Sequence, residues 1–144
     1  MKKIITLLFF LVFCKQSISL EVTLTQGSIK PTPIAITNIY SKSSNCEKIG
    51  KNISNVISDN LERSGLFIPL DQKAFIQNNE SLSRQPRFED WKIIKAQHLV
   101  SGKISGTNGK ISVEFRLYDV FQQKQLVGRK YETNEKNWRR IAHI

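Results

Sequence analysis

The sequence contains few of the residues that carry most protein chemistry. Its 144 residues include two cysteines, two histidines and one methionine. Cys14 lies in the apolar N-terminal run, so Cys46 has no partner within the mature chain, and a disulfide framework is excluded. Cys46 falls on the apolar face of a predicted helix, which favours a small buried hydrophobic residue over a reactive thiol.

Motifs of the common catalytic and metal-binding sites are also absent. No cysteine or carboxylate lies at metal-ligand spacing from His98 or His143, and no Gly-x-Ser-x-Gly occurs. Residues 102–106 (Gly-Lys-Ile-Ser-Gly) lack the spacing of a phosphate-binding loop. Glu89 and Asp90 begin a predicted helix, where carboxylates complement the helix dipole. The sequence predicts no catalytic, cofactor or metal site, and a protein that is not an enzyme.

The sequence has one long apolar run, at the N-terminus. A Met-Lys-Lys start precedes the apolar residues 4–14, and the small residues Ser17 and Ser19 follow. This pattern predicts a signal peptide over residues 1–19, cut before Leu20 or one residue later, because the run is too short to span about 30 Å of hydrocarbon. An uncleaved membrane anchor is the alternative. Since no second such run follows, we expect an exported mature chain without a transmembrane segment.

Basic residues exceed acidic ones. The chain has 22 Lys and Arg against 12 Asp and Glu, and removal of the three leader lysines leaves a net charge of +7. Such an excess is typical of nucleic-acid binding. Here the basic residues are scattered and share no face with stacking aromatic side chains, so nucleic acid is not an expected partner. Solubility, or attraction to an acidic envelope surface, accounts better for the charge.

About 125 residues remain after the leader, enough for one domain. Residues 20–30 are predicted to form a flexible N-terminal arm, because Val22 and Leu24 alternate with polar residues before a glycine and a Pro-Thr-Pro segment. Residues 31–144 are predicted to form the domain itself.

The domain alternates between strand and helix patterns. Strands are predicted at 33–40, 66–70, 98–105, 111–118 and 125–131, helices at 44–64, 88–96 and from 134, and a surface loop with at most one helical turn at 72–86. This order, β-α-β-α-β-β-β-α, predicts an α/β fold with a mixed β-sheet and packed helices. The last helix has only about two turns and is expected to be truncated.

Local signals fix several of these elements. Ser44 with Glu47 three residues later is typical of a capping box, and Gly65 is expected to end the first helix. Asn108-Gly109 predicts a tight hairpin turn. The apolar helix face comprises Cys46, Ile49, Ile53, Val56, Ile57 and Leu61. The strand after the turn is expected to bury Ile111, Val113, Phe115 and Leu117 and to leave Ser112, Glu114, Arg116 and Tyr118 in solvent.

Several segments together resemble the N-terminal domain of the TolB family. The two most specific runs are Asp-x-Leu-x-x-Ser-Gly-x-Phe at 59–67 and Arg-Arg-x-Ala-His at 139–143. Further similar segments are 21–24, 33–36, 53–58, 100–104 and 113–120. The resemblance covers essentially the whole mature chain and implies the TolB N-terminal fold.

The resemblance also implies a function. TolB proteins are non-catalytic adaptors of the periplasmic Tol-Pal system, which supports outer-membrane integrity and invagination during cell division. Their N-terminal arm binds the C-terminal domain of TolA, and a following β-propeller binds Pal. Carried over by position, the TolA-binding residues are Glu21, Val22, Thr23, Leu24, Thr25 and Gln26. No propeller follows within these 144 residues, so we expect a truncated relative, and the resemblance leaves the Pal contact in doubt.

Two alternatives remain open from the sequence. The first is a non-functional remnant of a TolB protein, suggested by the short final helix and the missing propeller. The second is a small exported ligand-binding domain, which requires a pocket with convergent polar residues. The sequence shows no such set.

Overall fold

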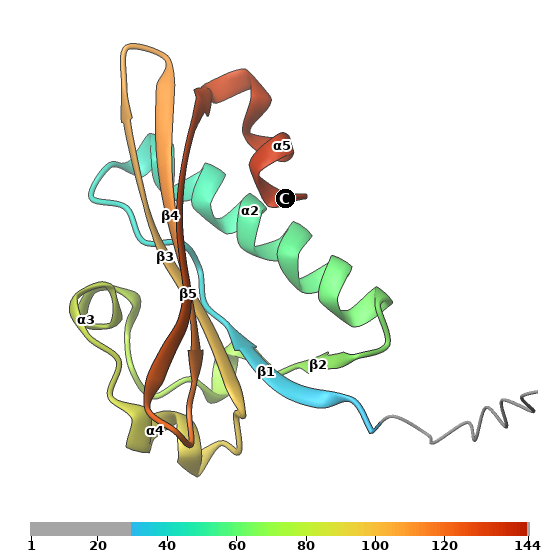
Figure 1. Ribbon diagram of the computed structural model, residues 1–144. Coiled ribbons are helices and arrows are strands. Elements are labelled where there is room, and N and C mark those ends of the chain that lie inside the picture. Colours follow the sequence, from blue (N-terminus) through green and yellow to red (C-terminus); the bar gives the residue numbers. More distant parts are fainter. Residues whose placement is uncertain (1–29, 144) are drawn as a thin grey trace, which may run out of the picture.

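The computed structural model describes residues 30–143 and shows one sheet flanked by helices (Figure 1). Its strands are β1 (Thr32–Ile36), β2 (Phe67–Pro69), β3 (His98–Thr107), β4 (Lys110–Asp119) and β5 (Lys124–Asn134). Its helices are α2 (Ser44–Arg63), α3 (Asn79–Arg84), α4 (Phe88–Ile93) and α5 (Trp138–Ala142), with 3₁₀ turns η1 (Gln72–Ala74) and η2 (Glu135–Asn137).

The sheet combines parallel and antiparallel pairing. Its strand order within the described residues is β2-β1-β3-β4-β5. Strand β1, second from one edge, runs parallel to β2 and to β3, and α2 connects β1 to β2. Strands β3, β4 and β5 form an antiparallel meander. The predicted α/β class, mixed sheet and element order are confirmed.

Two backbone signals read from the sequence are also confirmed. Asn108 and Gly109 have φ values of 52° and 74° and join β3 to β4, as a hairpin turn with two left-handed residues requires. Gly65 has a φ of 70° and follows Ser64, the C-cap residue of α2, at the position where a left-handed residue closes a helix.

Three local expectations are corrected. The capping box is wrong: Ser43, not Ser44, is the N-cap residue of α2, and it makes no side-chain cap hydrogen bond among the described residues. The expected loop at 72–86 contains both η1 and α3, and it buries Leu82. Tyr118 is not in solvent but buried, because α4 brings the Phe88 ring to 5.9 Å from its ring.

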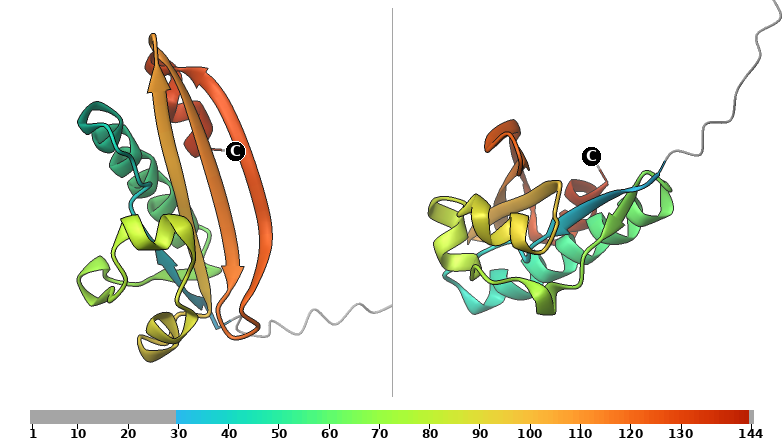
Figure 2. Two further views of the ribbon diagram at one scale, coloured as in Figure 1. Left: turned by 90° about the vertical axis from the view of Figure 1, so that its left-hand side faces the viewer. Right: turned by 90° about the horizontal axis from the view of Figure 1, so that it is seen from below.

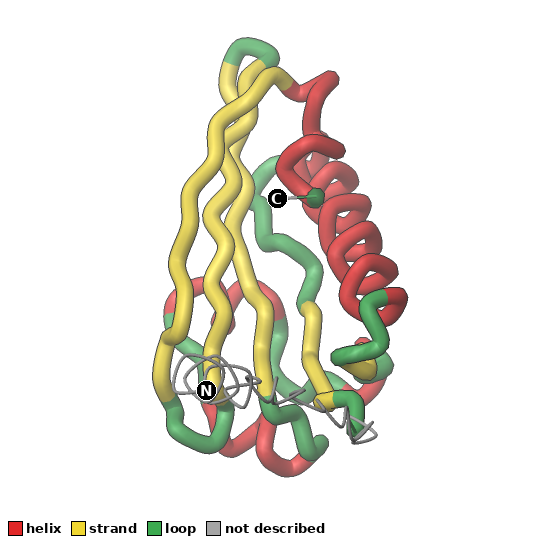
Figure 3. Tube along the Cα trace, turned by 45° about the vertical axis from the view of Figure 1, so that its right-hand side comes forward, coloured by secondary structure: helices red, strands yellow, loops and turns green. Residues whose placement is uncertain are grey.

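Helices cover both faces of the sheet, each over a different part. One face packs against α2 and α5, and the other packs against α3 and α4 near the lower end of the strands (Figures 1 and 2). Figure 3 shows α2 and α5 lying together beside the long strands. The first core comprises Ile39, Cys46, Ile49, Ile53, Ile104, Ile111, Val113, Ile141 and Ala142. The second comprises Ala35, Leu82, Trp91, Ala96, Leu99, Tyr118 and Val120.

Helix α2 lies very close to the segment that follows β1. A Cβ atom added to Gly50 would be 2.5 Å from the carbonyl oxygen of Ile39, a distance that real Cβ contacts do not reach. One turn later, the buried Ser54 hydroxyl accepts a hydrogen bond from the Ile39 amide at 3.1 Å. The same hydroxyl lies 2.9 Å from the carbonyl oxygen of Thr37, to which it donates. This contact satisfies backbone groups where the chain leaves β1.

The two isoleucines Ile53 and Ile93 provide a matched pair for testing the core. Ile53 is fully buried, whereas Ile93 is 70% exposed. Ile53→Ala should lower the free energy of unfolding by about 2–5 kcal/mol, because it leaves a cavity, and Ile93→Ala should change it by less than about 0.5 kcal/mol. Urea denaturation of the purified chain measures both. A non-cooperative transition, or equal effects of the two substitutions, would contradict the structure.

Gly50→Ala tests the close approach of α2. In an exposed helix interior, replacing glycine by alanine stabilises by about 1 kcal/mol. Here the added methyl group meets the Ile39 carbonyl, so we expect a loss of about 1–3 kcal/mol in the free energy of unfolding. Asn55→Ala, at an exposed position of the same helix, is the control and should be neutral or stabilising. Stabilisation by Gly50→Ala would show that α2 lies further from this segment.

Candidate interaction site

The predicted TolA-binding residues, Glu21, Val22, Thr23, Leu24, Thr25 and Gln26, lie outside the described residues. The structure therefore leaves their role as a prediction, together with the leader at 1–19 and the arm boundaries at 20–30. It does show where the arm would join the domain. The exposed Lys30 leads into β1, whose first residue, Thr32, is paired with Phe67 of β2. The arm thus enters the domain at a strand held between two others.

The two histidines that were considered as possible site residues contact other side chains of the domain. The His98 ring packs edge-to-face on the Phe67 ring at 6.2 Å, and the His143 Nδ1 atom lies 3.2 Å from the Asn60 amide nitrogen. Residues 30–143 contain no group of three His, Cys, Asp or Glu side chains able to hold a metal ion. Cys46 is buried, as expected.

The carboxylates of Glu89 and Asp90 are engaged in separate ion pairs on α4. Lys92 Nζ lies 2.8 Å from a Glu89 oxygen, and an Arg87 nitrogen lies 2.7 Å from an Asp90 oxygen. Both acids lie in the first turn of the helix. This arrangement agrees with a helix-stabilising role rather than with an acid–base pair.

No helix within residues 30–143 is both long enough and apolar enough to span a membrane.

An apolar groove of about 350 Å³ lies between α2, α5 and the sheet. It is lined by Ile57, Asn60, Leu61, Val100, Phe115, Val127, Arg129, Tyr131, Ile141, Ala142 and His143. Helix α5 turns back from the upper end of β5 towards α2 (Figure 1), and its Ile141 and Ala142 line the groove. Val127 in its wall is 43% exposed. Sequence reasoning missed the groove, because its walls come from residues up to 86 positions apart that no local pattern connects.

A family comparison agrees with this fold. The TolB amino-terminal domain model matches residues 20–126. The protein is 48% identical over 124 residues to the Tol-Pal system protein TolB of Paramagnetospirillum magneticum, which covers 85% of this chain and 28% of that relative. The chain therefore spans little more than a quarter of the length of this curated relative.

Solved structures show the same architecture. The crystal structure of TolB from Acinetobacter baumannii superimposes with a TM-score of 0.64 at 21% identity, over 79% of this chain and 26% of that one. Lipoprotein GNA1162 from Neisseria meningitidis superimposes with a TM-score of 0.57 at 17% identity, over 73% and 81%. At such identities these likenesses concern the fold alone.

Together, the mixed sheet and the helices on its two faces define an α/β domain. The match over residues 20–126 makes the assignment specific: the chain belongs to the TolB amino-terminal domain family.

We expect an apolar dye to bind in the groove. Anilinonaphthalene sulfonate should fluoresce in the presence of the folded chain, because its rings fit an apolar groove and its sulfonate is attracted by Arg129. Val127→Lys should remove most of the enhancement. Leu126→Lys is the matched control: Leu126 is as exposed as Val127 but does not line the groove. Equal loss in both variants would place the dye elsewhere.

Proposed function

We propose that this protein is a periplasmic adaptor of the Tol-Pal system, which binds the C-terminal domain of TolA through residues 21–26. The main support is the family match, which begins at Leu20 and so includes the whole arm. That starting point also coincides with the predicted cleavage site after Ser19. A relative with 48% identity is a Tol-Pal system protein TolB.

The arm suits attachment by strand addition. An extended segment can add backbone hydrogen bonds to an exposed sheet edge of the partner, while alternate side chains fill pockets. In an extended conformation Val22 and Leu24 would lie on one side of the arm, and Thr23 and Thr25 on the other. A segment that must order on binding pays an entropic cost, so the link is readily reversible.

The domain acts in this proposal as the rigid base of the arm. Strand β1 is fixed on both sides, by β2 and β3, and its Ile34, Ala35 and Ile36 side chains are buried. A pull on the arm is therefore transmitted to the sheet. The proposed outcome is a link from the inner-membrane Tol proteins towards the outer membrane that supports envelope integrity and invagination during division. Pal is not proposed as a partner of these 144 residues.

The other readings have less support. Two well-packed cores on opposite sheet faces are typical of a domain that folds, which argues against a non-functional remnant. For a small-molecule site, the groove beside α2 has the apolar lining that such sites share, but two of its four polar side chains, Asn60 and His143, already contact each other at 3.2 Å. No catalytic role is proposed.

Substitutions on the two sides of the arm test the proposal. The chain, exported and purified from the periplasm, is titrated with the TolA C-terminal domain by isothermal calorimetry. Val22→Asp with Leu24→Asp should weaken binding by at least about a hundredfold, because each buried aliphatic side chain contributes about 1.5–3 kcal/mol. Thr23→Asp with Thr25→Asp introduces the same charge on the other side and should weaken binding much less.

Deletion of residues 21–26 should abolish the binding heat altogether. Undiminished affinity after the deletion would disprove the arm assignment. Equal losses in the two double variants would point to charge repulsion rather than to side-chain pockets. Circular dichroism of each variant confirms that the domain is intact.

A further inference from the structure

One face of the sheet is uncovered in its upper half. On the side opposite α2, helices α3 and α4 cover only the lower part of β3, β4 and β5 (Figure 2). Above them, the pairing register places three polar rows across the strands. They are Lys103–Glu114–Lys130, Ser105–Ser112–Glu132 and Thr107–Lys110–Asn134. We call these residues, with Lys42 and Arg116 at their border, the polar sheet face.

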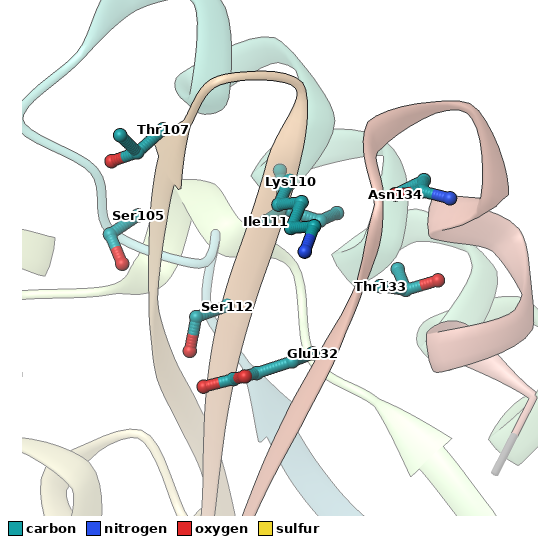
Figure 4. A pocket seen from close by; sticks show the side chains of 8 residues that line it. All are labelled: Ser105, Thr107, Lys110, Ile111, Ser112, Glu132, Thr133 and Asn134. Atoms are coloured by element: carbon teal, nitrogen blue, oxygen red, sulfur yellow. The ribbon is translucent and has the colours of Figure 1, made fainter.

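The polar sheet face is hollowed. A depression of about 490 Å³ lies near the hairpin end, between Ser105, Ser112 and Glu132 (Figure 4). A second, of about 430 Å³, adjoins it and extends from Lys130 to the segment 40–43, which runs beside β3 through a bridge between Tyr40 and Lys103. The two hollows share Ser105 and Ser112, so they form one continuous surface.

Positive charge dominates this surface. It carries five cations, Lys42, Lys103, Lys110, Arg116 and Lys130, against the two carboxylates of Glu114 and Glu132. Each carboxylate already has a cation: Arg116 lies 3.4 Å from Glu114, and Lys130 lies 3.0 Å from Glu132. Within residues 30–143, Lys42, Lys103 and Lys110 have no carboxylate within 4.0 Å. Three ammonium groups are left to meet acidic groups of another molecule.

The chemistry of the surface indicates which class of partner it can bind. The exposed large apolar residues of the described range lie elsewhere, so insertion into a membrane is disfavoured. Tyr40 is the single aromatic side chain among the residues that line the two hollows, whereas proteins that bind nucleic acid strands stack successive bases on several rings. Instead, the hydroxyl-bearing residues Ser105, Thr107 and Ser112 line the same depression as Lys110 (Figure 4). Hydroxyls and ammonium groups suit the carbonyls and carboxylates of an acidic polypeptide.

We propose that the polar sheet face docks an acidic polypeptide segment, with Lys103 and Lys110 binding its carboxylates. This surface is independent of the arm: it uses β3, β4 and β5, and the arm joins at β1. Deletion of residues 21–26 should leave it unchanged, so its failure and that of the TolA proposal are distinguishable.

The probe is a short poly-L-glutamate peptide, added to isotope-labelled protein at low ionic strength. Amide resonances of Ser105, Ser112 and their neighbours should shift, and those of the exposed side of α2 should not. Lys103→Glu with Lys110→Glu should weaken binding by at least about tenfold, since opposite charges are replaced by like ones. Lys48→Glu with Lys51→Glu, the same charge change on α2, is the matched control and should weaken it by less than about threefold.

Three outcomes would overturn the proposal. Equal weakening in both variants would indicate a general response to net charge. Resonance shifts confined to another surface of the wild-type chain would overturn the proposal even if a variant failed to fold. Tighter binding of a double-stranded DNA oligonucleotide to the same face would favour a nucleic-acid partner instead.

Discussion

The close approach of α2 to the backbone after β1 is the contact on which the rest of the structure depends. Gly50 permits it, because the Ile39 carbonyl occupies the place of a side chain, and Ser54 satisfies the backbone that leaves the strand. With α2 held there, Ile49 and Ile53 reach the core, and the helix can return the chain to β2 on the far side of β1. The strand from which the predicted arm extends is thereby fixed between two parallel neighbours.

The helices leave part of each face of the sheet uncovered, and these uncovered parts form the exposed surfaces of the domain. The long antiparallel strands extend beyond the helices that cover them, so one face leaves an apolar groove beside α2 and α5, and the other leaves a polar, basic area above α3. The two areas are chemically opposite although both lie on β3, β4 and β5. Alternation of side chains along each strand is sufficient to produce this difference. The same three strands thus carry two surfaces of different chemistry.

Sequence patterns predicted the fold where a local signal dictates structure. The spacing of Cys46, Ile49 and Ile53 fixed the first helix, and Asn108-Gly109 fixed the hairpin, because few conformations satisfy either pattern. The prediction that Tyr118 lies in solvent was wrong, because alternation indicates which residues share a face of the sheet, not which helix covers that face. Helix α3 was missed as a helix because its six residues carry little apolar periodicity, with Leu82 as the buried side chain. The groove and the polar sheet face arise from strand register, which a single sequence does not encode locally.

We propose that the folded domain carries a separate arm that binds TolA. The most direct test maps the contact by nuclear magnetic resonance, with isotope-labelled chain and unlabelled TolA C-terminal domain. The account predicts large shifts at Glu21 to Gln26, smaller ones near the start of β1, and unchanged resonances along β4 and β5. Shifts centred on the groove or on the long strands, with the arm unaffected, would contradict it.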